Sequence, residues 1–138
     1  MGNVTVLGSF IVDLAFRSER LPKPGETVSG EFVMGPGGKG SNQAVAAKLA
    51  GADVNLITAV GNDDFARVAL SFYQKIGLSA KYVHLVKGVH TGVAAIGVET
   101  GNGQNQIMVA PGAGDKITKQ MIRRAADAFS VGGVFLTQ

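Results

Sequence analysis

Apolar residues gather in short runs along the chain, and each run ends at glycine or at small polar residues. Residues 4–7, 54–60, 82–86 and 133–137 are such runs, rich in valine, leucine and isoleucine. Runs of this length and composition are typical of strands that are buried on both faces of a sheet. The pattern therefore predicts four strands of a buried sheet.

Segments with helical spacing or helix-favouring composition lie between these runs. Residues 41–49 are rich in alanine, and residues 64–76 place their large apolar side chains three and four positions apart. Gly51 and Gly77 follow these segments and are good helix stops. The spacing also predicts a helix over 116–129. Strands that alternate with helices imply βαβ units and a mainly parallel sheet flanked by helices.

Two parts of the chain, residues 10–34 and 91–109, do not fit this alternation. Each holds two short strand-like runs around a turn, and in the second part the turn is Gly101-Asn102-Gly103, which indicates a hairpin. We expect these parts to form a small additional sheet outside the main layer. The strand-like runs are 14–16, 27–34, 91–98 and 106–109.

Composition agrees with one folded domain that has a real core. Of the 138 residues, 46% are hydrophobic and 17% are charged, which excludes a disordered chain. The chain has no cysteine, which excludes disulfides and thiolate zinc sites. We see neither a signal peptide nor a run long enough to span a bilayer, so we expect a cytoplasmic protein that does not bind membranes.

The formal net charge is +3, which raises the question of nucleic-acid binding. The basic residues are scattered, apart from one group in the helix predicted over 116–129. A solvated helix face explains that group better than a nucleic-acid site, and no nucleic-acid partner is expected. The group is Lys116, Lys119, Arg123 and Arg124.

Residues 35–40 form the densest glycine cluster, with four glycines in six positions, and they precede the helix predicted over 41–49. The cluster matches G-x-G-x-x-G, but a dinucleotide fingerprint follows the first strand directly, and here that strand ends at Gly8. A Walker A loop needs Ser or Thr after its lysine, whereas Gly40 follows Lys39. Both nucleotide-binding motifs are therefore rejected.

The chemistry of this cluster still favours a binding site. Glycines allow a ligand to approach the backbone, and the following helix start offers free N–H groups. Lys39 adds a positive charge, and Asn42 adds a donor and an acceptor. The cluster suits a hydroxyl-rich ligand or a developing anion, although a turn that merely packs on the sheet is the alternative. Asp13 is a second candidate because it follows a buried strand closely, and its alternative role is a turn or cap.

Several of these segments, taken together and in order, resemble the ribokinase (PfkB) carbohydrate kinase family. The run Gly-Gly-Lys-Gly-Ser-Asn-Gln-Ala-Val-Ala-Ala is the most specific of them, and the resemblance covers nearly the whole chain. The matching segments are 8–13, 22–27, 37–47, 51–52, 61–63 and 91–94.

The resemblance implies a ribokinase-like α/β fold in which a small β-sheet lid covers the sugar. Residues 1–138 would be the N-terminal half of that domain, with lid strands within about 10–34 and 91–109. The lid would also form a homodimer interface. The residues expected to bind the sugar are Asp13, Gly37, Gly38, Lys39, Gly40 and Asn42.

For activity, the resemblance implies ATP-dependent phosphorylation of a sugar hydroxymethyl group by the full-length protein. ATP and Mg²⁺ would be the cofactors, and a monovalent cation is a further candidate. The catalytic base, the anion hole, the nucleotide site and any metal ligands would lie in a missing C-terminal part. The 138-residue chain alone is therefore expected to be inactive.

One position departs from the family's pattern. Members usually have Asn two residues before the sugar-binding Asp, where it too contacts the sugar, and here that residue is Ile11. A site that lacks one polar partner can discriminate strongly between substrates. A sugar other than ribose, or a nucleoside bound by a nucleoside kinase of the same fold, is thus an alternative. A truncated module that only binds sugar or dimerises is another.

Three remaining polar residues are interpreted as structural. Gly112-Ala113-Gly114-Asp115 looks like the family's late motif that carries the catalytic base, but it lies too early in the chain and in the wrong context. We therefore expect Asp115 to cap the helix predicted after it. His84 and His90 have no partner nearby in the sequence.

Overall fold

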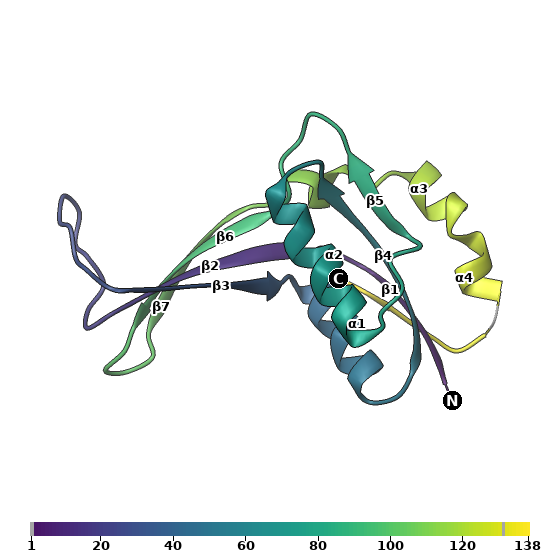
Figure 1. Cartoon of the computed structure of the whole chain (residues 1–138), viewed down its shortest axis with the longest axis horizontal. Helices are drawn as coiled ribbons and strands as arrows, with labels where there is room; N and C mark the ends of the chain where they lie inside the picture. Colours follow the sequence, from purple (N-terminus) through teal and green to yellow (C-terminus); the bar gives the residue numbers. More distant parts are fainter. Residues whose placement is uncertain (1, 131) are drawn as a thin grey trace.

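The computed structural model describes residues 2–130 and 132–138, which form two four-stranded sheets (Figure 1). All neighbouring strands of the first sheet are parallel, in the order β5-β4-β1-β8. The buried parallel sheet predicted from the apolar runs is thus confirmed, with bounds within one residue of those expected. Its strands are β1 (Asn3–Leu7), β4 (Asp53–Gly61), β5 (Val83–Val86) and β8 (Val134–Thr137).

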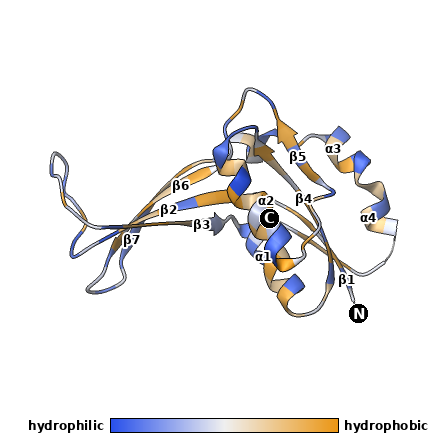
Figure 2. Ribbon diagram, in the orientation of Figure 1, coloured by the Kyte–Doolittle hydropathy of each residue, from blue (hydrophilic) through white to orange (hydrophobic). Residues whose placement is uncertain are grey.

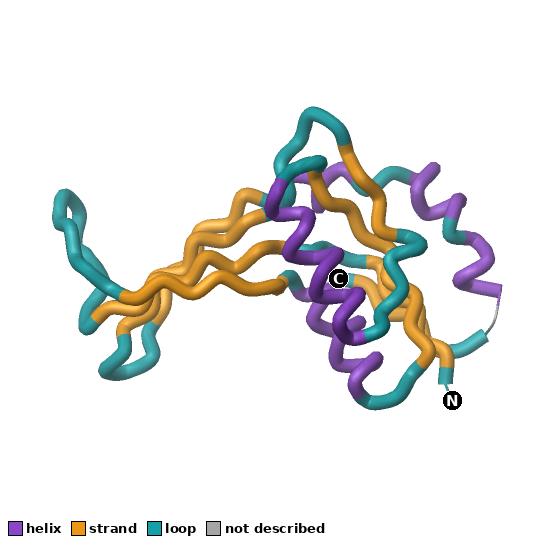
Figure 3. The backbone as a smooth tube through the Cα atoms, in the orientation of Figure 1, coloured by secondary structure: helices purple, strands orange, loops and turns teal. Residues whose placement is uncertain are grey.

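Helices cover both faces of this sheet, as Figures 1 and 3 show. Consecutive residues of β4 point to opposite faces: Leu56 packs in the cluster that holds Tyr73 of α2, whereas Ile57 packs against Ala125 and Ala128. Burial on both faces explains why the strands are continuous apolar runs. None of the helices in the described residues is long and apolar enough to cross a membrane. The α-helices are α1 (Lys39–Leu49), α2 (Asp64–Ile76), α3 (Lys119–Arg124) and α4 (Ala126–Ser130).

The helix predicted over 116–129 is wrong in its extent. A 3₁₀ turn, η1 (Gly112–Lys116), comes first, and Ile117 then adopts an extended backbone that separates it from α3. The side chain of Thr118 caps α3 by accepting a hydrogen bond from the Met121 N–H at 3.2 Å. Asp115 therefore does not cap that helix. The four basic side chains of this region are exposed, as expected for a solvated face.

The second sheet has the strand order β3-β2-β6-β7 and extends away from the helices (Figures 1 and 3). The central pair β2·β6 is parallel, while β2·β3 and the predicted hairpin β6·β7 are antiparallel. Its strands fall largely in the two parts of the sequence that broke the βαβ alternation. They are β2 (Ile11–Ser18), β3 (Glu31–Gly37), β6 (Val93–Glu99) and β7 (Asn105–Ala110).

The glycine cluster at 35–40 is not a loop, contrary to the prediction. Gly35 and Gly37 belong to β3 and pair with Asp13 and Ile11 of β2, and α1 already begins at Lys39. Since an extended strand and a helix follow each other so closely, the whole change of direction occurs at one residue. This residue is Gly38, whose φ of 92° lies in the region that favours glycine.

A buried hydrogen-bond network joins the two sheets. Asp63 caps α2 by accepting from the Ala66 N–H at 3.0 Å, and it also accepts from the N–H and hydroxyl of Thr91 at 2.7 and 2.6 Å. The Thr91 hydroxyl in turn accepts from the Gly61 N–H at 2.9 Å. Partial burial pushes the pKa of Asp63 upward, but these hydrogen bonds outweigh it and leave the pKa below its ordinary value. The network thus anchors the start of β6 to the end of β4.

Candidate functional site

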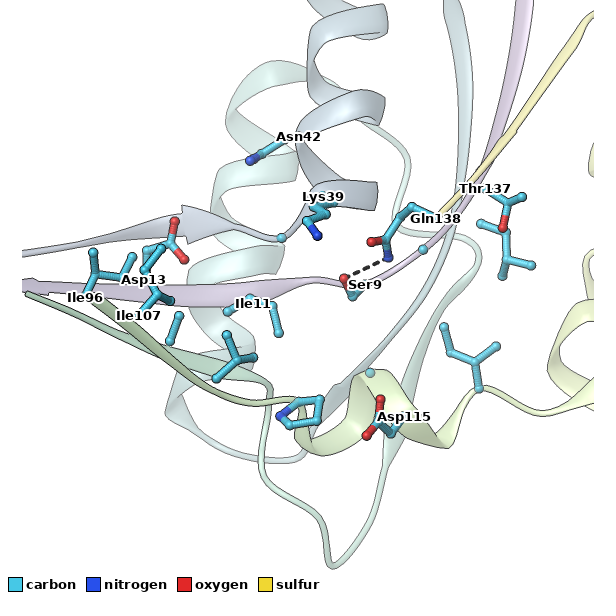
Figure 4. A pocket seen from close by; sticks show the side chains of 18 of the residues that line it. Ser9, Ile11, Asp13, Lys39, Asn42, Ile96, Ile107, Asp115, Thr137 and Gln138 are labelled. Carbon is cyan, nitrogen blue, oxygen red and sulfur yellow. Dashed lines mark hydrogen bonds between the residues drawn. The ribbon is translucent and has the colours of Figure 1, made fainter. Parts of the chain in front are cut away.

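A cavity of about 700 Å³ lies where the two sheets meet (Figure 4). Its floor is the segment that leaves β1, one side is the start of α1, and the other sides come from β6, β7 and η1. The carboxyl ends of parallel strands are where open α/β sheets bind their ligands. The cavity is therefore the candidate site, and four of the six predicted sugar-binding residues line it: Asp13, Gly38, Lys39 and Asn42.

Asp13 lies within β2 and not in a turn or cap, so that alternative role is wrong. Its carboxylate occupies the place where a side chain at Gly37 would stand, with Cγ 2.6 Å from the position of such a Cβ. No described residue donates a hydrogen bond to this carboxylate. Partial burial raises the pKa of Asp13. Gly37 does not line the cavity, but its missing side chain makes room for the Asp13 carboxylate.

The start of α1 lies directly against the segment that follows β1. A Cβ at Gly38 would stand 2.6 to 2.9 Å from backbone atoms of residues 9–11, and one at Gly40 would stand 2.6 Å from Gly8. The Ser41 N–H donates to the Ser9 carbonyl at 3.1 Å. Gly38 provides no side-chain cap for α1, which leaves N–H groups of the first turn available to a ligand. Gly40 itself does not line the cavity and acts through this close packing.

Lys39 and Asn42 project from α1 on the side of the cavity that faces β2 and Asp13 (Figure 4). Both side chains are exposed, so they can reorient to meet a ligand. The cavity is thus surrounded by the ammonium of Lys39, the amide of Asn42, the carboxylate of Asp13 and free backbone N–H groups of α1. This set of groups can hold several hydroxyls at once.

Tyr73 holds the start of α1 in place from behind. Its hydroxyl donates to the Ser41 hydroxyl at 2.8 Å, both residues are buried, and its ring meets that of Phe10 edge-on at 6.0 Å. Burial raises the pKa of Tyr73 to about 12, so the phenol stays protonated and donates at all physiological pH values.

We expect Tyr73→Phe to destabilise the full-length protein by about 1 kcal/mol, because it leaves the buried Ser41 hydroxyl without its donor. Urea unfolding checks this value. Ser41→Ala combined with Tyr73→Phe is the control, because removing both partners should cost less than the sum of the two single changes. Full additivity would show that the hydrogen bond does not stabilise the fold.

The sequence analysis missed part of the lining, most of which is apolar. Asp115 also lines the cavity from η1, although it was expected to cap a helix. The alternation of inward and outward residues in the predicted hairpin strands could have indicated this apolar side, because one face of β6 and β7 lies toward Asp13. The apolar residues in question are Ala94, Ile96, Ile107, Val109 and Pro111.

The two histidines lie outside this lining, in agreement with a structural role. Partial burial, together with nearby Arg124, lowers the pKa of His84, and His90 Nδ1 lies 2.7 Å from the Thr91 carbonyl oxygen. Within residues 2–130 and 132–138, no group of three His, Cys, Asp or Glu side chains could hold a metal ion.

A parallel α/β layer, a second sheet beside it and a cavity between them that is lined by Asp13, Lys39 and Asn42 define an α/β protein with one candidate ligand site. The family model described as "pfkB family carbohydrate kinase" matches residues 1–138, and the chain belongs to that family. The resemblance stated from the sequence is thereby confirmed.

Two curated relatives show how much of the family's length is present. The chain is 35% identical to the ribokinase of Mus musculus over 136 residues, which are 98% of this chain and 42% of the relative. It is 38% identical to the deoxyribokinase of Salmonella typhi over 126 residues, 91% of this chain and 41% of the relative. The chain thus spans about two fifths of the length of these relatives.

Solved structures agree on the fold. The ribokinase of Giardia lamblia superimposes with a TM-score of 0.91 at 28% identity, over 99% of this chain and 41% of the other. An Arabidopsis thaliana ribokinase complexed with ribose and ATP superimposes with a TM-score of 0.71 at 30% identity, over 81% of this chain and 36% of the other. The ribokinase-like fold, as its N-terminal portion, is therefore confirmed.

Proposed function

We propose that the full-length protein transfers the γ-phosphoryl group of ATP to a sugar hydroxymethyl group, and that this chain supplies the sugar-binding half. The observation that carries the proposal is the convergence of Asp13, Gly38, Lys39 and Asn42 on one cavity. A relative supports the same chemistry, since the Arabidopsis thaliana ribokinase was solved in complex with ribose and ATP. An ATP-dependent sugar kinase also fits the cytoplasmic location that we propose.

Each group in the cavity has a role that follows from its chemistry. The Asp13 carboxylate accepts hydrogen bonds from two neighbouring sugar hydroxyls, and ionised acceptors make the stronger bonds. Lys39 donates to a hydroxyl from the opposite side, and Asn42 both donates and accepts. Gly38 lets the sugar approach the first turn of α1, and Gly40 allows that turn to pack against Gly8. Together these contacts hold the sugar so that its hydroxymethyl group is presented for phosphorylation.

Within the described residues, no group of three His, Cys, Asp or Glu side chains could hold a metal ion. From the family's pattern, we propose that the catalytic base, the anion hole and the sites for ATP, Mg²⁺ and any monovalent cation lie in the rest of the full-length protein. The 138-residue chain alone is proposed to be inactive, although it would retain the sugar contacts.

The test is ADP release by the full-length protein with Mg-ATP against ribose, 2-deoxyribose, fructose, other ketoses and adenosine. Activity on one free sugar supports the proposal. Activity on adenosine in preference to every free sugar would instead indicate the nucleoside kinase that Ile11 left open. No ADP release with any substrate would point to a module that binds sugar or dimerises without catalysis.

We further propose that the second sheet is a lid over the sugar, with its strands largely within 10–34 and 91–109, and that it joins two copies of the protein. Strand register puts several large apolar side chains on the face opposite Asp13. Figure 2 colours much of these strands as hydrophobic. A group of large apolar side chains that is exposed to solvent favours association. The side chains are Phe16, Phe32, Met34 and Met108, which are between 47% and 76% exposed.

Met108→Lys is expected to weaken the homodimer at least tenfold, because it places a charge in the apolar centre of the contact. Sedimentation of the full-length protein over a range of concentrations measures the dissociation constant. Leu49→Lys is the matched control, because Leu49 is 70% exposed but lies on α1, away from this sheet. An unchanged dissociation constant for Met108→Lys would refute the proposed interface.

A further inference from the structure

Asp63 does not line the cavity, but it holds residues 90–92, which we call the junction segment. Its carboxylate accepts two hydrogen bonds from Thr91, with Oδ2 2.7 Å from the backbone nitrogen and Oδ1 2.6 Å from the hydroxyl. Thr91 is fully buried, and its hydroxyl also accepts a hydrogen bond from the Gly61 N–H at 2.9 Å. Since Gly61 ends β4 and Asp63 follows it closely, the junction segment is tied to the buried parallel sheet.

Two walls of the cavity depend on the junction segment through their strands. β6 begins directly after it, and two residues of that strand, Ala94 and Ile96, line the cavity. The Gly92 carbonyl accepts a hydrogen bond from the Val12 N–H at 2.8 Å, which fixes β2 next to Asp13. A shift of the junction segment would therefore move both the β6 wall and the strand that carries Asp13.

A third wall of the cavity, η1, rests on the same segment. The His90 carbonyl accepts a hydrogen bond from the Ala113 N–H at 2.9 Å. A Cβ at Gly112 would stand 2.7 Å from His90 Nδ1, so the turn lies directly on this residue. Asp115 lies further along η1 and lines the cavity (Figure 4). Three walls thus share one support, and the Asp63 carboxylate holds that support in place.

From these contacts we infer that Asp63 is a positioning residue of the sugar site, because it fixes β2, β6 and η1 relative to the buried sheet. This inference rests on the proposed kinase function. The cavity also has a wall on α1, so a sugar that spans the cavity needs its walls at fixed separations. Misplacement of binding groups by about 1 Å can cost about a hundredfold, so we expect loss of this support to raise the KM for the sugar by about 10-fold to 100-fold.

Asp63→Ser separates this role from helix capping. Serine caps a helix about as well as aspartate, so the hydrogen bond from the Ala66 N–H is kept, but its single oxygen cannot hold Thr91 as well. In the full-length protein the KM for the sugar should rise about tenfold or more, while kcat changes little, because the lost support serves binding and not the chemical step. Asp64→Ser is the matched control, since it removes the same charge one residue later, where Asp64 pairs with Arg67 on the surface.

Thr91→Val and Thr91→Ser test the other partner of this contact. Valine keeps the shape of threonine but removes the hydroxyl that joins Asp63 to Gly61, whereas serine keeps that hydroxyl. Thr91→Val should therefore raise the KM, and Thr91→Ser should leave it near the value of the unchanged protein. Initial rates of ADP release give kcat and KM, with whichever free sugar among ribose, 2-deoxyribose and fructose the full-length protein uses best.

Gly51→Ala is the control for a general loss of stability. An added Cβ there meets nothing within 4 Å, and Gly51 does not line the cavity, so backbone strain should lower the stability while the KM stays the same. Urea unfolding of each variant shows that it is folded under the conditions of the assay. A KM that rose in Gly51→Ala as much as in Asp63→Ser would show that the KM follows stability, and it would overturn the inference.

The remaining outcomes separate this inference from the proposed function. An unchanged KM for Asp63→Ser, equal KM values for Thr91→Val and Thr91→Ser, or a fall in kcat without a rise in KM would overturn the positioning role while the kinase remained. If Thr91→Val does not fold, the comparison of Asp63→Ser with Asp64→Ser still decides. Absence of ADP release by the unchanged protein with every sugar would overturn the proposed function itself, and this inference with it.

Discussion

Asp13→Ala is expected to lower kcat/KM of the full-length protein for its sugar about 1,000-fold. The carboxylate lines the cavity, and none of the described residues donates a hydrogen bond to it. Its oxygens can therefore accept hydrogen bonds from the ligand. Two hydrogen bonds to an ionised group contribute about 1.5 to 3 kcal/mol each, and their loss corresponds to roughly this factor. Initial rates of ADP release at several sugar concentrations measure the change.

The matched control is Asp64→Ala, because Asp64 is a fully solvated aspartate at the first turn of α2, paired only with Arg67 on the surface. It should leave kcat/KM nearly unchanged. Asp13→Asn keeps the shape but loses one acceptor and the charge, so it should fall between the two. If Asp13→Ala retained more than a tenth of the activity, the sugar could not depend on this carboxylate.

The central layer could be predicted from the sequence because local and tertiary signals agree there. Residues 54–60 are apolar at every position except Asn55 and Thr58, and the structure buries both of their faces. The helix predicted over 64–76 has the observed bounds, since Asp63 caps its start and Gly77, with φ 67°, ends it. The sequence was therefore sufficient to predict a strand that is buried on both faces and a helix whose ends are set by one cap residue and one glycine.

The glycine cluster and the last helices could not be predicted in the same way. The composition of Gly35 and Gly37 predicts a loop, but both residues pair with β2, and the Asp13 carboxylate occupies the space that a side chain at Gly37 would need. The apolar spacing over 116–129 predicts one helix, yet Ile117 is extended and the Thr118 side chain caps α3, which begins only at Lys119. In both places the deciding contact comes from another part of the chain or from a competing local hydrogen bond.

The apolar half of the site was missed for a related reason. Ile96 and Ile107 look like ordinary strand residues in the sequence, and only the pairing of β2 with β6 brings them beside Asp13. The polar half was found because aspartate, lysine and asparagine among glycines are informative by themselves. Sequence therefore predicted most of the polar lining of the cavity, and the structure added its apolar side.

Gly38→Ala is the second change for which we expect a large effect, a destabilisation of about 3 kcal/mol. Two costs combine at this position. The φ of 92° is unfavourable for alanine, and the new methyl group would overlap backbone atoms of residues 9–11 at 2.6 to 2.9 Å. Urea unfolding of the full-length protein measures the loss of stability, and sugar affinity should fall with it because α1 can no longer lie against that segment.

Two other glycines separate the costs. Gly51 has almost the same φ, 91°, but nothing within 4 Å of an added Cβ, so Gly51→Ala should cost only the strain, about 1 kcal/mol. Gly40 has no unfavourable φ but would overlap Gly8, so Gly40→Ala reports the overlap alone. If Gly38→Ala cost no more than Gly51→Ala, the close contact between α1 and the segment after β1 would not constrain the fold. The placement of Lys39 and Asn42 opposite Asp13, which we propose for sugar binding, would then need another explanation.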